Sequence, residues 1–212
     1  MEKKGLLLVV SGFSGAGKGT LMKELLDHYD NYALSVSATT RAPREGELHG
    51  REYFFLKREE FLRLIEEDAL YEYAEYAGNY YGTPRQYVDE KLAEGLDVIL
   101  EIEVQGAEKI KKQFPDTVLI FVTPPSADEL KRRLVGRGTE TAEKIDKRLK
   151  RAVEEAKYMP FYDYILVNDD LAESTVRLHD IISSEHAVSA RNRDFILQIT
   201  DELKIVTNEK GE

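Results

Sequence analysis

The 212-residue sequence has no cysteine and no long hydrophobic segment. Without cysteine the chain can form neither disulfide bonds nor thiolate zinc sites, which is typical of a protein from the reducing cytosol. Its four histidines are scattered without metal-ligand spacing, so we interpret them as surface or structural residues. The apolar run near the N-terminus is too short for a signal peptide or a membrane span. The sequence therefore predicts a soluble, cytoplasmic protein.

Positive charge is also scarce, because 30 Lys and Arg residues stand against 40 Asp and Glu residues, for a net charge of −10. So acidic a chain is poorly suited to general binding of nucleic acid or of anionic membranes. Any recognition of phosphate must therefore come from local clusters of Arg and Lys. The length is enough for one core with insertions, and we expect a monomer or a small homo-oligomer.

A glycine-rich loop lies between an apolar run, Leu6 to Val10, and a segment with apolar residues at helical spacing, Leu21 to Leu26. Its spacing is G-x-x-x-x-G-K, in which small residues let backbone N–H groups converge on phosphate and the lysine reaches the terminal phosphates. An ordinary strand-to-helix turn is the alternative, which the lysine, the spacing and the flanking segments together disfavour. We predict phosphate contacts from Gly12, Phe13, Ser14, Gly15, Ala16, Gly17, Lys18, Gly19 and Thr20.

One position of this loop departs from the usual pattern. The residue after Lys18 is Gly19, where Ser or Thr usually touches magnesium. The nearest hydroxyl is that of Thr20, which is therefore the candidate magnesium ligand in the loop. Phosphate binding does not depend on this departure.

Downstream, apolar runs alternate with helical patterns. The runs at 97–102 and 117–122 predict buried strands, and the run at 164–167 predicts a further strand. Segments 31–38 and 53–55 read as short strands, 57–68 has apolar residues on one helical face, and 70–81 reads as a small antiparallel, β-rich insertion. The sequence therefore predicts an α/β fold with a mostly parallel sheet flanked by helices. The tail from residue 187 has apolar residues at helical spacing and is expected to pack as a terminal helix.

Three further groups of residues suggest chemistry. Arg41 and Arg44 lie three apart in a polar loop, where each guanidinium could grip phosphate in two places; alternatively, they are solvated loop residues. Glu72, among tyrosines, could accept two hydrogen bonds from the N1–H and exocyclic amine of guanine, or could belong to the polar face of a strand. Glu101 and Glu103 follow a buried strand, where α/β sheets place their ligands, and could order substrate or magnesium-bound water.

A third basic group comes from a helix that begins with a capping box at Ser126 and from a very charged helix, 142–157, that we interpret as a surface flap. Arg133, Arg137 and Arg148 are candidates to fold over polyphosphate. The alternative is that they are solvated charges on the helix surface.

Five motifs occur in order and with compatible spacing: SVSATTRAPREGE (35–47), GNYYGT (78–83), EIEVQG (101–106), GRGTE (136–140) and VNDD (167–170). With the glycine loop they closely resemble the guanylate kinase family, from about residue 5 to about residue 184. The resemblance implies a P-loop core (1–36, 85–125 and 160–186), an inserted β-rich GMP-binding domain (37–84), a helical lid (126–159) and a helical tail (187–212).

By resemblance, Ser37 and Glu72 would bind the guanine base, with Thr83 close by. The GMP phosphate would be held by Arg41, Arg44, Tyr53 and Tyr81, and Glu47 would steady the two arginines. Glu101 and Glu103 would complete the GMP side, although the family usually has Asp where this chain has Glu103. Lys18 and the lid arginines Arg133, Arg137 and Arg148 would be catalytic, while Asn168 and Asp169 would lie near the adenine. Magnesium, held by Thr20 or Glu101 directly or through water, would accompany ATP.

The sequence thus predicts ATP-dependent phosphorylation of GMP, and of dGMP, in purine nucleotide metabolism. The alternatives are a kinase for another nucleoside monophosphate and a non-catalytic, guanylate-kinase-like module that binds proteins. An intact glycine loop with its lysine disfavours the module. A GTPase is disfavoured because the sequence has no N-K-x-D motif for reading guanine.

Overall fold

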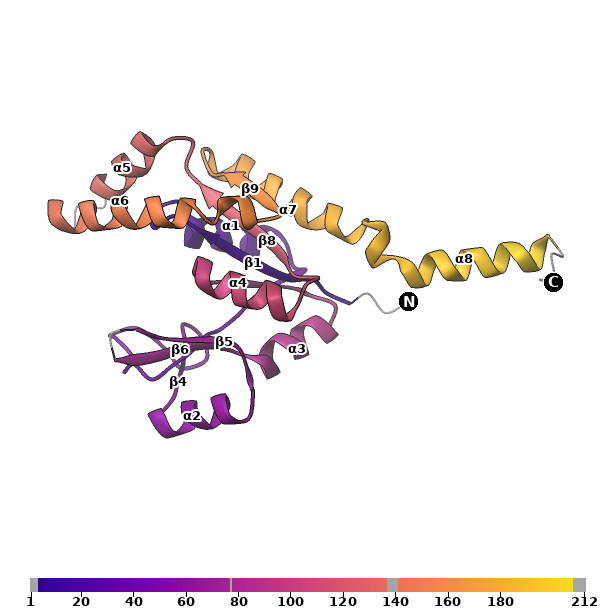
Figure 1. The fold of residues 1–212 in the computed structure, drawn as a ribbon, viewed down its shortest axis with the longest axis horizontal. Helices are drawn as coiled ribbons and strands as arrows, with labels where there is room; N and C mark the ends of the chain where they lie inside the picture. Colours follow the sequence, from indigo (N-terminus) through magenta and orange to yellow (C-terminus); the bar gives the residue numbers. More distant parts are fainter. Residues whose placement is uncertain (1–3, 77, 137–140, 208–212) are drawn as a thin grey trace.

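The computed structural model describes residues 4–76, 78–136 and 141–207, and its strands form two separate sheets (Figure 1). The larger sheet has the strand order β2-β7-β1-β8-β9, and every neighbouring pair is parallel. Its strands are β1 (Leu7–Gly12), β2 (Tyr32–Leu34), β7 (Asp97–Glu101), β8 (Val118–Thr123) and β9 (Tyr164–Val167).

Both faces are buried at the central strands β1, β7 and β8, which explains why these strands read as continuous apolar runs. At the edge strand β9, Ile165 and Val167 are exposed. Leu8 and Val10 of β1 face a cluster built with α1 (Lys18–His28) and α7 (Leu171–His186). Val9 faces the opposite cluster, built with α3 (Arg85–Ala93) and α4 (Val104–Gln113). The predicted α/β architecture with a parallel sheet between helices is confirmed.

The smaller sheet is mixed, with the strand order β4-β3-β6-β5. Its strands are β3 (Ala38–Thr39), β4 (Phe54–Phe55), β5 (Leu70–Tyr76) and β6 (Asn79–Pro84). One helix, α2 (Arg58–Glu66), covers it through the fully buried Phe61. The single strand expected over 31–38 is wrong, since β2 ends at Leu34 in one sheet and β3 begins at Ala38 in the other. The chain therefore crosses between the two sheets at 35–37 and returns after Pro84.

A helix pair follows β8. Helices α5 (Ala127–Gly136) and α6 (Ala142–Ala156) meet through Leu130, Leu134 and Ala152, and a short turn of 3-10 helix, η1 (Met159–Phe161), leads into β9. Phe13 of the glycine loop packs against this small cluster. The loop is therefore attached to the helix pair as well as to the sheet.

The chain ends in η2 (Ser189–Arg191) and α8 (Arg193–Val206), and α8 extends away from the other elements (Figure 1). Every residue of α8 is exposed. The helix was expected, but its packing against the core was not correct, because none of its apolar side chains is covered by the described part of the chain. No helix within the described ranges combines the length and the apolar character needed to cross a membrane.

Candidate active site

The glycine loop joins the end of β1 to the start of α1. At two of its glycines, neighbouring residues leave no room for a side chain. A Cβ on Gly12 (φ 150°) would lie 2.0 Å from the carbonyl oxygen of Val122, and one on Gly17 (φ 89°) would lie 2.7 Å from Nδ2 of Asn168. Gly17 is also the N-cap of α1, so the first N–H groups of that helix, which lack helical acceptors, are presented beside the loop. The loop is thus shaped to bind an anion.

Lys18 begins α1 and folds back over the loop. Its Nζ donates to the carbonyl oxygens of Gly12 at 2.8 Å and Phe13 at 3.3 Å. Burial lowers the pKa of Lys18, while the negative charges of Glu101 and Glu103 oppose that shift. The ammonium group is therefore held inside the loop, poorly solvated, where a polyphosphate would gain most from it.

Two of the predicted arginines reach the loop from the helix pair. Arg148 of α6 donates to Oγ of Ser14 at 2.6 Å. Arg133 of α5 lies 3.4 Å from the carbonyl oxygen of Ala16, and its Nε donates to Glu129 at 2.6 Å. The third, Arg137, lies outside the described residues.

Asn168 and Asp169 follow β9. Asn168 is buried, and its Nδ2 donates to the carbonyl oxygen of Ala16 at 2.8 Å. The contact to Ala16 holds the loop from the side of β9. Asp169 is exposed beside it.

A second cationic group lies on the smaller sheet. Arg41 forms two hydrogen bonds to the carboxylate of Glu47, both at 3.0 Å, and the same carboxylate accepts the backbone N–H of Arg44 at 2.7 Å. These bonds raise the pKa of Arg41 and lower the pKa of Glu47. The guanidinium lies 5.4 Å from the ring centre of Tyr53, whose ring is 6.2 Å from that of Tyr81. Four of the five side chains predicted at the phosphate site therefore lie close together, namely Arg41, Glu47, Tyr53 and Tyr81. The fifth residue, Arg44, is exposed.

Glu72 and Thr83, predicted near the guanine, lie on the paired strands β5 and β6. Oγ1 of Thr83 donates to Glu72 at 3.0 Å. Burial raises the pKa of Glu72, and the hydrogen bond from Thr83 opposes that shift. The carboxylate faces the beginning of α4, where a Cβ on Gly106 would lie 3.6 Å from its Oε2. Ser37, also predicted to contact the base, is partly buried at the crossing between the sheets.

Glu101 and Glu103 lie where β7 ends and α4 begins, close enough for their charges to affect the pKa of Lys18. Burial raises the pKa of Glu101, and Lys18 opposes that shift. Glu103 forms an ion pair of 2.8 Å with Arg151 of α6, which also binds Glu155 at 2.9 Å. Sequence reasoning missed Arg151 and Glu155, although Arg151 lies three residues after Arg148, on the same face of a predicted helix.

The oxygen ligands near the loop suit magnesium only if the substrate provides the other ligands. Thr20 is exposed in the first turn of α1, and Glu101 is the carboxylate with the largest electrostatic effect on the pKa of Lys18. Within the described residues, no group of three acidic or histidine side chains could hold a metal ion by itself. Hydroxyl and carboxylate oxygens fit Mg²⁺ best when substrate phosphates supply the remaining ligands.

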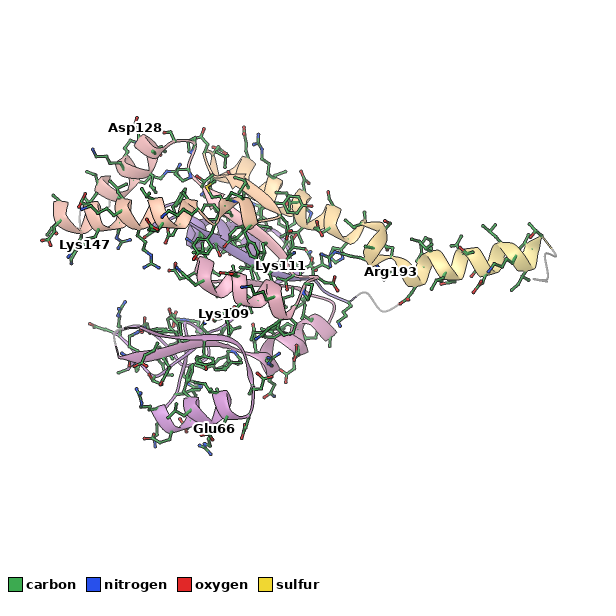
Figure 2. All side chains as sticks on the ribbon, viewed as in Figure 1. Glu66, Lys109, Lys111, Asp128, Lys147 and Arg193 are labelled. Carbon is green, nitrogen blue, oxygen red and sulfur yellow. The ribbon has the colours of Figure 1, made fainter. Side chains whose placement is uncertain are left out.

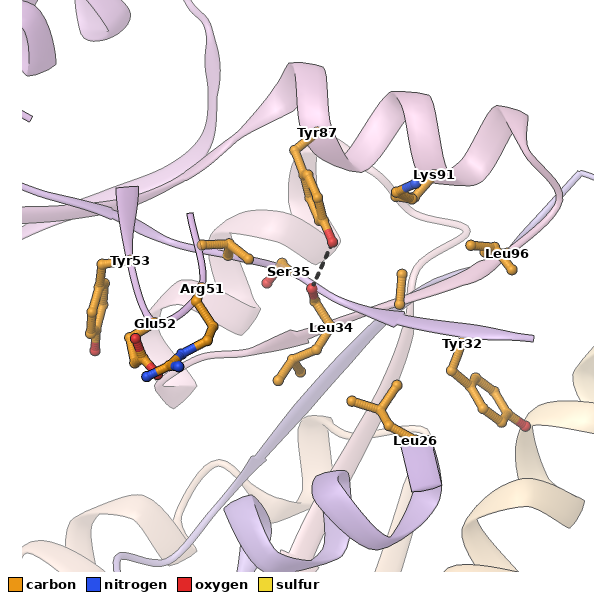
Figure 3. Close-up of a pocket in the computed structure, with 12 residues that line it drawn as sticks. Leu26, Tyr32, Leu34, Ser35, Arg51, Glu52, Tyr53, Tyr87, Lys91 and Leu96 are labelled. Atoms are coloured by element: carbon orange, nitrogen blue, oxygen red, sulfur yellow. Dashed lines mark hydrogen bonds and ion pairs between the residues drawn. The ribbon is translucent and has the colours of Figure 1, made fainter. Parts of the chain in front are cut away.

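A groove of about 660 Å³ lies between the two sheets, beside the edge strand β2 (Figure 3). It is bounded by Leu34 of β2, by the segment Arg51 to Tyr53, and by Tyr87 and Lys91 of α3. The hydroxyl of Tyr87 donates to the carbonyl oxygen of Leu34 at 3.4 Å. A smaller cavity, of about 320 Å³, lies between the glycine loop and α6.

The parallel sheet has a glycine loop and a lysine after its first strand, and arginines reach that loop from a helix pair. The inserted sheet has a separate cationic group. Together these features define a P-loop nucleotide kinase. A sequence profile of guanylate kinase matches residues 4–185. The guanylate kinase of Caldanaerobacter subterraneus subsp. tengcongensis is 49% identical over 202 residues, covering 95% of this chain and 98% of that protein. The guanylate kinase of Halalkalibacterium halodurans is 54% identical over 192 residues, covering 90% and 94%.

The crystal structure of guanylate kinase from Anaplasma phagocytophilum superimposes with a TM-score of 0.70, at 37% identity over 90% of each chain. The chain therefore belongs to the guanylate kinase family.

Proposed function

We propose that this guanylate kinase binds ATP at the glycine loop and GMP at the inserted sheet, and transfers the γ-phosphoryl group between them. The observation that carries this proposal is the presence of two separate cationic groups, Lys18 with the loop and Arg41 with Glu47, on different sheets of one chain. One anion site would serve a nucleotide hydrolase equally well. Two sites match a reaction with two phosphorylated substrates.

On the donor side, the loop N–H groups and Lys18 would hold the β- and γ-phosphates, and Arg133, Arg137 and Arg148 would neutralise charge that develops during transfer. Asn168 supports the loop, and Asp169 would lie near the adenine. Mg²⁺ bound to ATP, with Thr20 or Glu101 as ligand directly or through water, would neutralise the phosphates and orient them.

On the acceptor side, Arg41, Arg44, Tyr53 and Tyr81 would hold the GMP phosphate, with Glu47 fixing the two arginines. The base would be read by Ser37, Glu72 and Thr83, and Glu101 and Glu103 would complete the site. Glu72 carries the specificity, because a carboxylate can accept both the N1–H and the exocyclic amine of guanine. Adenine lacks that pair of donors.

We further propose that residues 37–84 act as the acceptor-binding unit and residues 126–159 as a lid over ATP. The rest of residues 1–186 is the core. Because phosphoryl transfer needs positioning and charge stabilisation more than covalent catalysis, closure of these units would bring the substrates in line and exclude water. Such an enzyme would act in the cytoplasm, where both nucleotides are made and used.

A coupled assay of ADP formation, with GMP, dGMP, AMP, CMP, UMP and dTMP as acceptors, tests the proposal. We expect turnover with GMP, and with dGMP, and little with the other four. Lys18→Ala should remain folded by circular dichroism and lose about 10²-fold or more of kcat, because it removes a charge used in the transition state. Preference for another acceptor, or near-normal turnover by Lys18→Ala, would refute the assignment.

A further inference from the structure

Arg151 of α6 joins that helix to the start of α4, near the glycine loop. Its guanidinium binds Glu103, at the N-terminus of α4, at 2.8 Å, and Glu155, one turn further along α6, at 2.9 Å. Glu155 is only 4% exposed, and its Oε2 has no hydrogen-bond partner among the described residues. Arg151 is therefore the cation that lies between an exposed carboxylate of the core and a buried carboxylate of α6.

Other ion pairs of α6 are different in kind. Lys147 pairs with Glu143 and Lys150 with Asp146, each within the helix and with both side chains at least 60% exposed. Pairs of that sort contribute a few tenths of a kcal/mol and fix nothing outside their own helix. The Arg151 pair joins positions 48 residues apart and so can hold one element against another.

The position of α6 determines where Arg148 lies. Arg148 and Arg151 are three residues apart and therefore point to the same side of the helix. Along this face, Arg148 donates to Ser14 of the glycine loop at 2.6 Å, and Arg151 binds Glu103. Both arginines, with Ser14, Glu103 and Lys147, line the cavity of about 320 Å³ between loop and helix.

We infer that Arg151 is a positioning residue for phosphoryl transfer, whose ion pair with Glu103 holds α6 against the core and thereby sets Arg148 over the glycine loop. The inference rests on the proposed function. Because Glu103 is also a proposed contact of GMP, the same carboxylate links the acceptor side to the lid.

The test compares Arg151→Ala with Lys150→Ala in the full chain. Both variants remove one positive charge from α6, but only the first breaks the contact with the core. We expect kcat with ATP and GMP to fall roughly 10- to 100-fold in Arg151→Ala, because small displacements of a catalytic group have effects of that size. Lys150→Ala should retain the wild-type kcat. Equal kcat values in the two variants would overturn the inference.

Arg151→Ala leaves Glu155 buried without its cation, so Arg151→Lys serves as the conservative variant. Lysine keeps the positive charge but cannot bind two carboxylates with one planar group. We expect its thermal unfolding to match the wild type and its kcat to lie between those of wild type and Arg151→Ala. Full recovery of kcat by lysine would show that charge alone matters and would overturn the positioning role.

A double-mutant cycle with Glu103→Gln isolates the pair itself. If the pair acts as a unit, the double variant should be no slower than the slower single variant. Strictly multiplicative losses of kcat would contradict the inference. Failure of the wild type to phosphorylate GMP would instead refute the proposed function, so the two failures are distinguishable.

Discussion

At the scale of single residues, Glu72 combines burial with a charge that its proposed function requires. Burial raises the pKa of Glu72, and the hydrogen bond from Thr83 and the positive charge of Lys109 oppose that shift in favour of the ionised form. A carboxylate kept short of partners in the free protein gains most when two donors of a ligand reach it. The burial that disfavours the Glu72 carboxylate in the free protein therefore favours a ligand with two donors, such as guanine.

Replacing Glu72 by Gln should separate the two substrates. The amide presents one acceptor and one donor where guanine offers two donors, so we expect KM for GMP to rise about 10- to 100-fold, the effect of losing a charged hydrogen bond. KM for ATP should stay near the wild-type value. Steady-state kinetics with each substrate varied in turn measures this, with Glu75→Gln, an exposed residue of the same strand, as the charge-matched control. An equal rise in both KM values would remove Glu72 from the base site.

The same variant should also alter stability. Because the folded pKa of Glu72 lies above its unfolded value, the folded protein holds this proton over a pH range in which the unfolded chain has lost it. The free energy of unfolding therefore falls as pH rises through that range, and Gln removes this loss. Urea unfolding at pH 7 should show Glu72→Gln to be more stable than the wild type, whereas Glu75→Gln should not differ.

At the scale of elements, the glycine loop depends on the spacing between β1 and β8. Gly12 ends β1 opposite Val122, and no side chain fits between the two backbones. The loop, α1 and the edge of the sheet are therefore positioned by one close backbone contact. The glycine pattern serves packing at this point as well as phosphate binding.

Gly12→Ala should accordingly destabilise the whole fold. The added Cβ would lie 2.0 Å from the carbonyl oxygen of Val122, so β1 and β8 must separate. We expect a loss of at least about 2 kcal/mol in the free energy of unfolding, as is typical of overpacking in a core. Gly19→Ala is the matched control, since a Cβ there meets nothing within 4 Å. If thermal melts of the two variants coincide, the close approach does not limit stability.

At the scale of the whole molecule, sequence patterns predicted the buried strands and the phosphate-binding loop. Buried strands such as 97–101 were evident from continuous apolar runs, and the glycine loop from its spacing. The division of 31–38 between two sheets was not, because a run of small and apolar residues fits one strand as well as two. Arg151 was missed because Glu103, with which it forms an ion pair, is distant in sequence.

The tail shows the same limit most clearly. Phe195, Ile196, Ile199 and Leu203 have helical spacing, which predicts an amphipathic helix, and α8 does form. Periodicity shows that a helix has an apolar face but does not identify what covers that face. In the structure α8, which begins at Arg193, extends away from the core, and every one of its residues is exposed (Figure 2).

Because α8 buries nothing against the described core, removing residues 193–212 should leave the rest of the enzyme intact. A chain ending at Asn192 keeps the hydrogen bonds of that side chain to the carbonyl oxygens of His186 and Val188, which close the end of α7. We expect unchanged kcat and KM values and a melting temperature within about 2 °C of the full chain, because exposed residues contribute little to stability. Leu178→Ala, which empties a fully buried position of α7, provides the contrast, with an expected loss of about 2 to 5 kcal/mol. A truncated chain that melts as low as Leu178→Ala would mean that α8 supports the fold in solution, contrary to its exposure along its whole length.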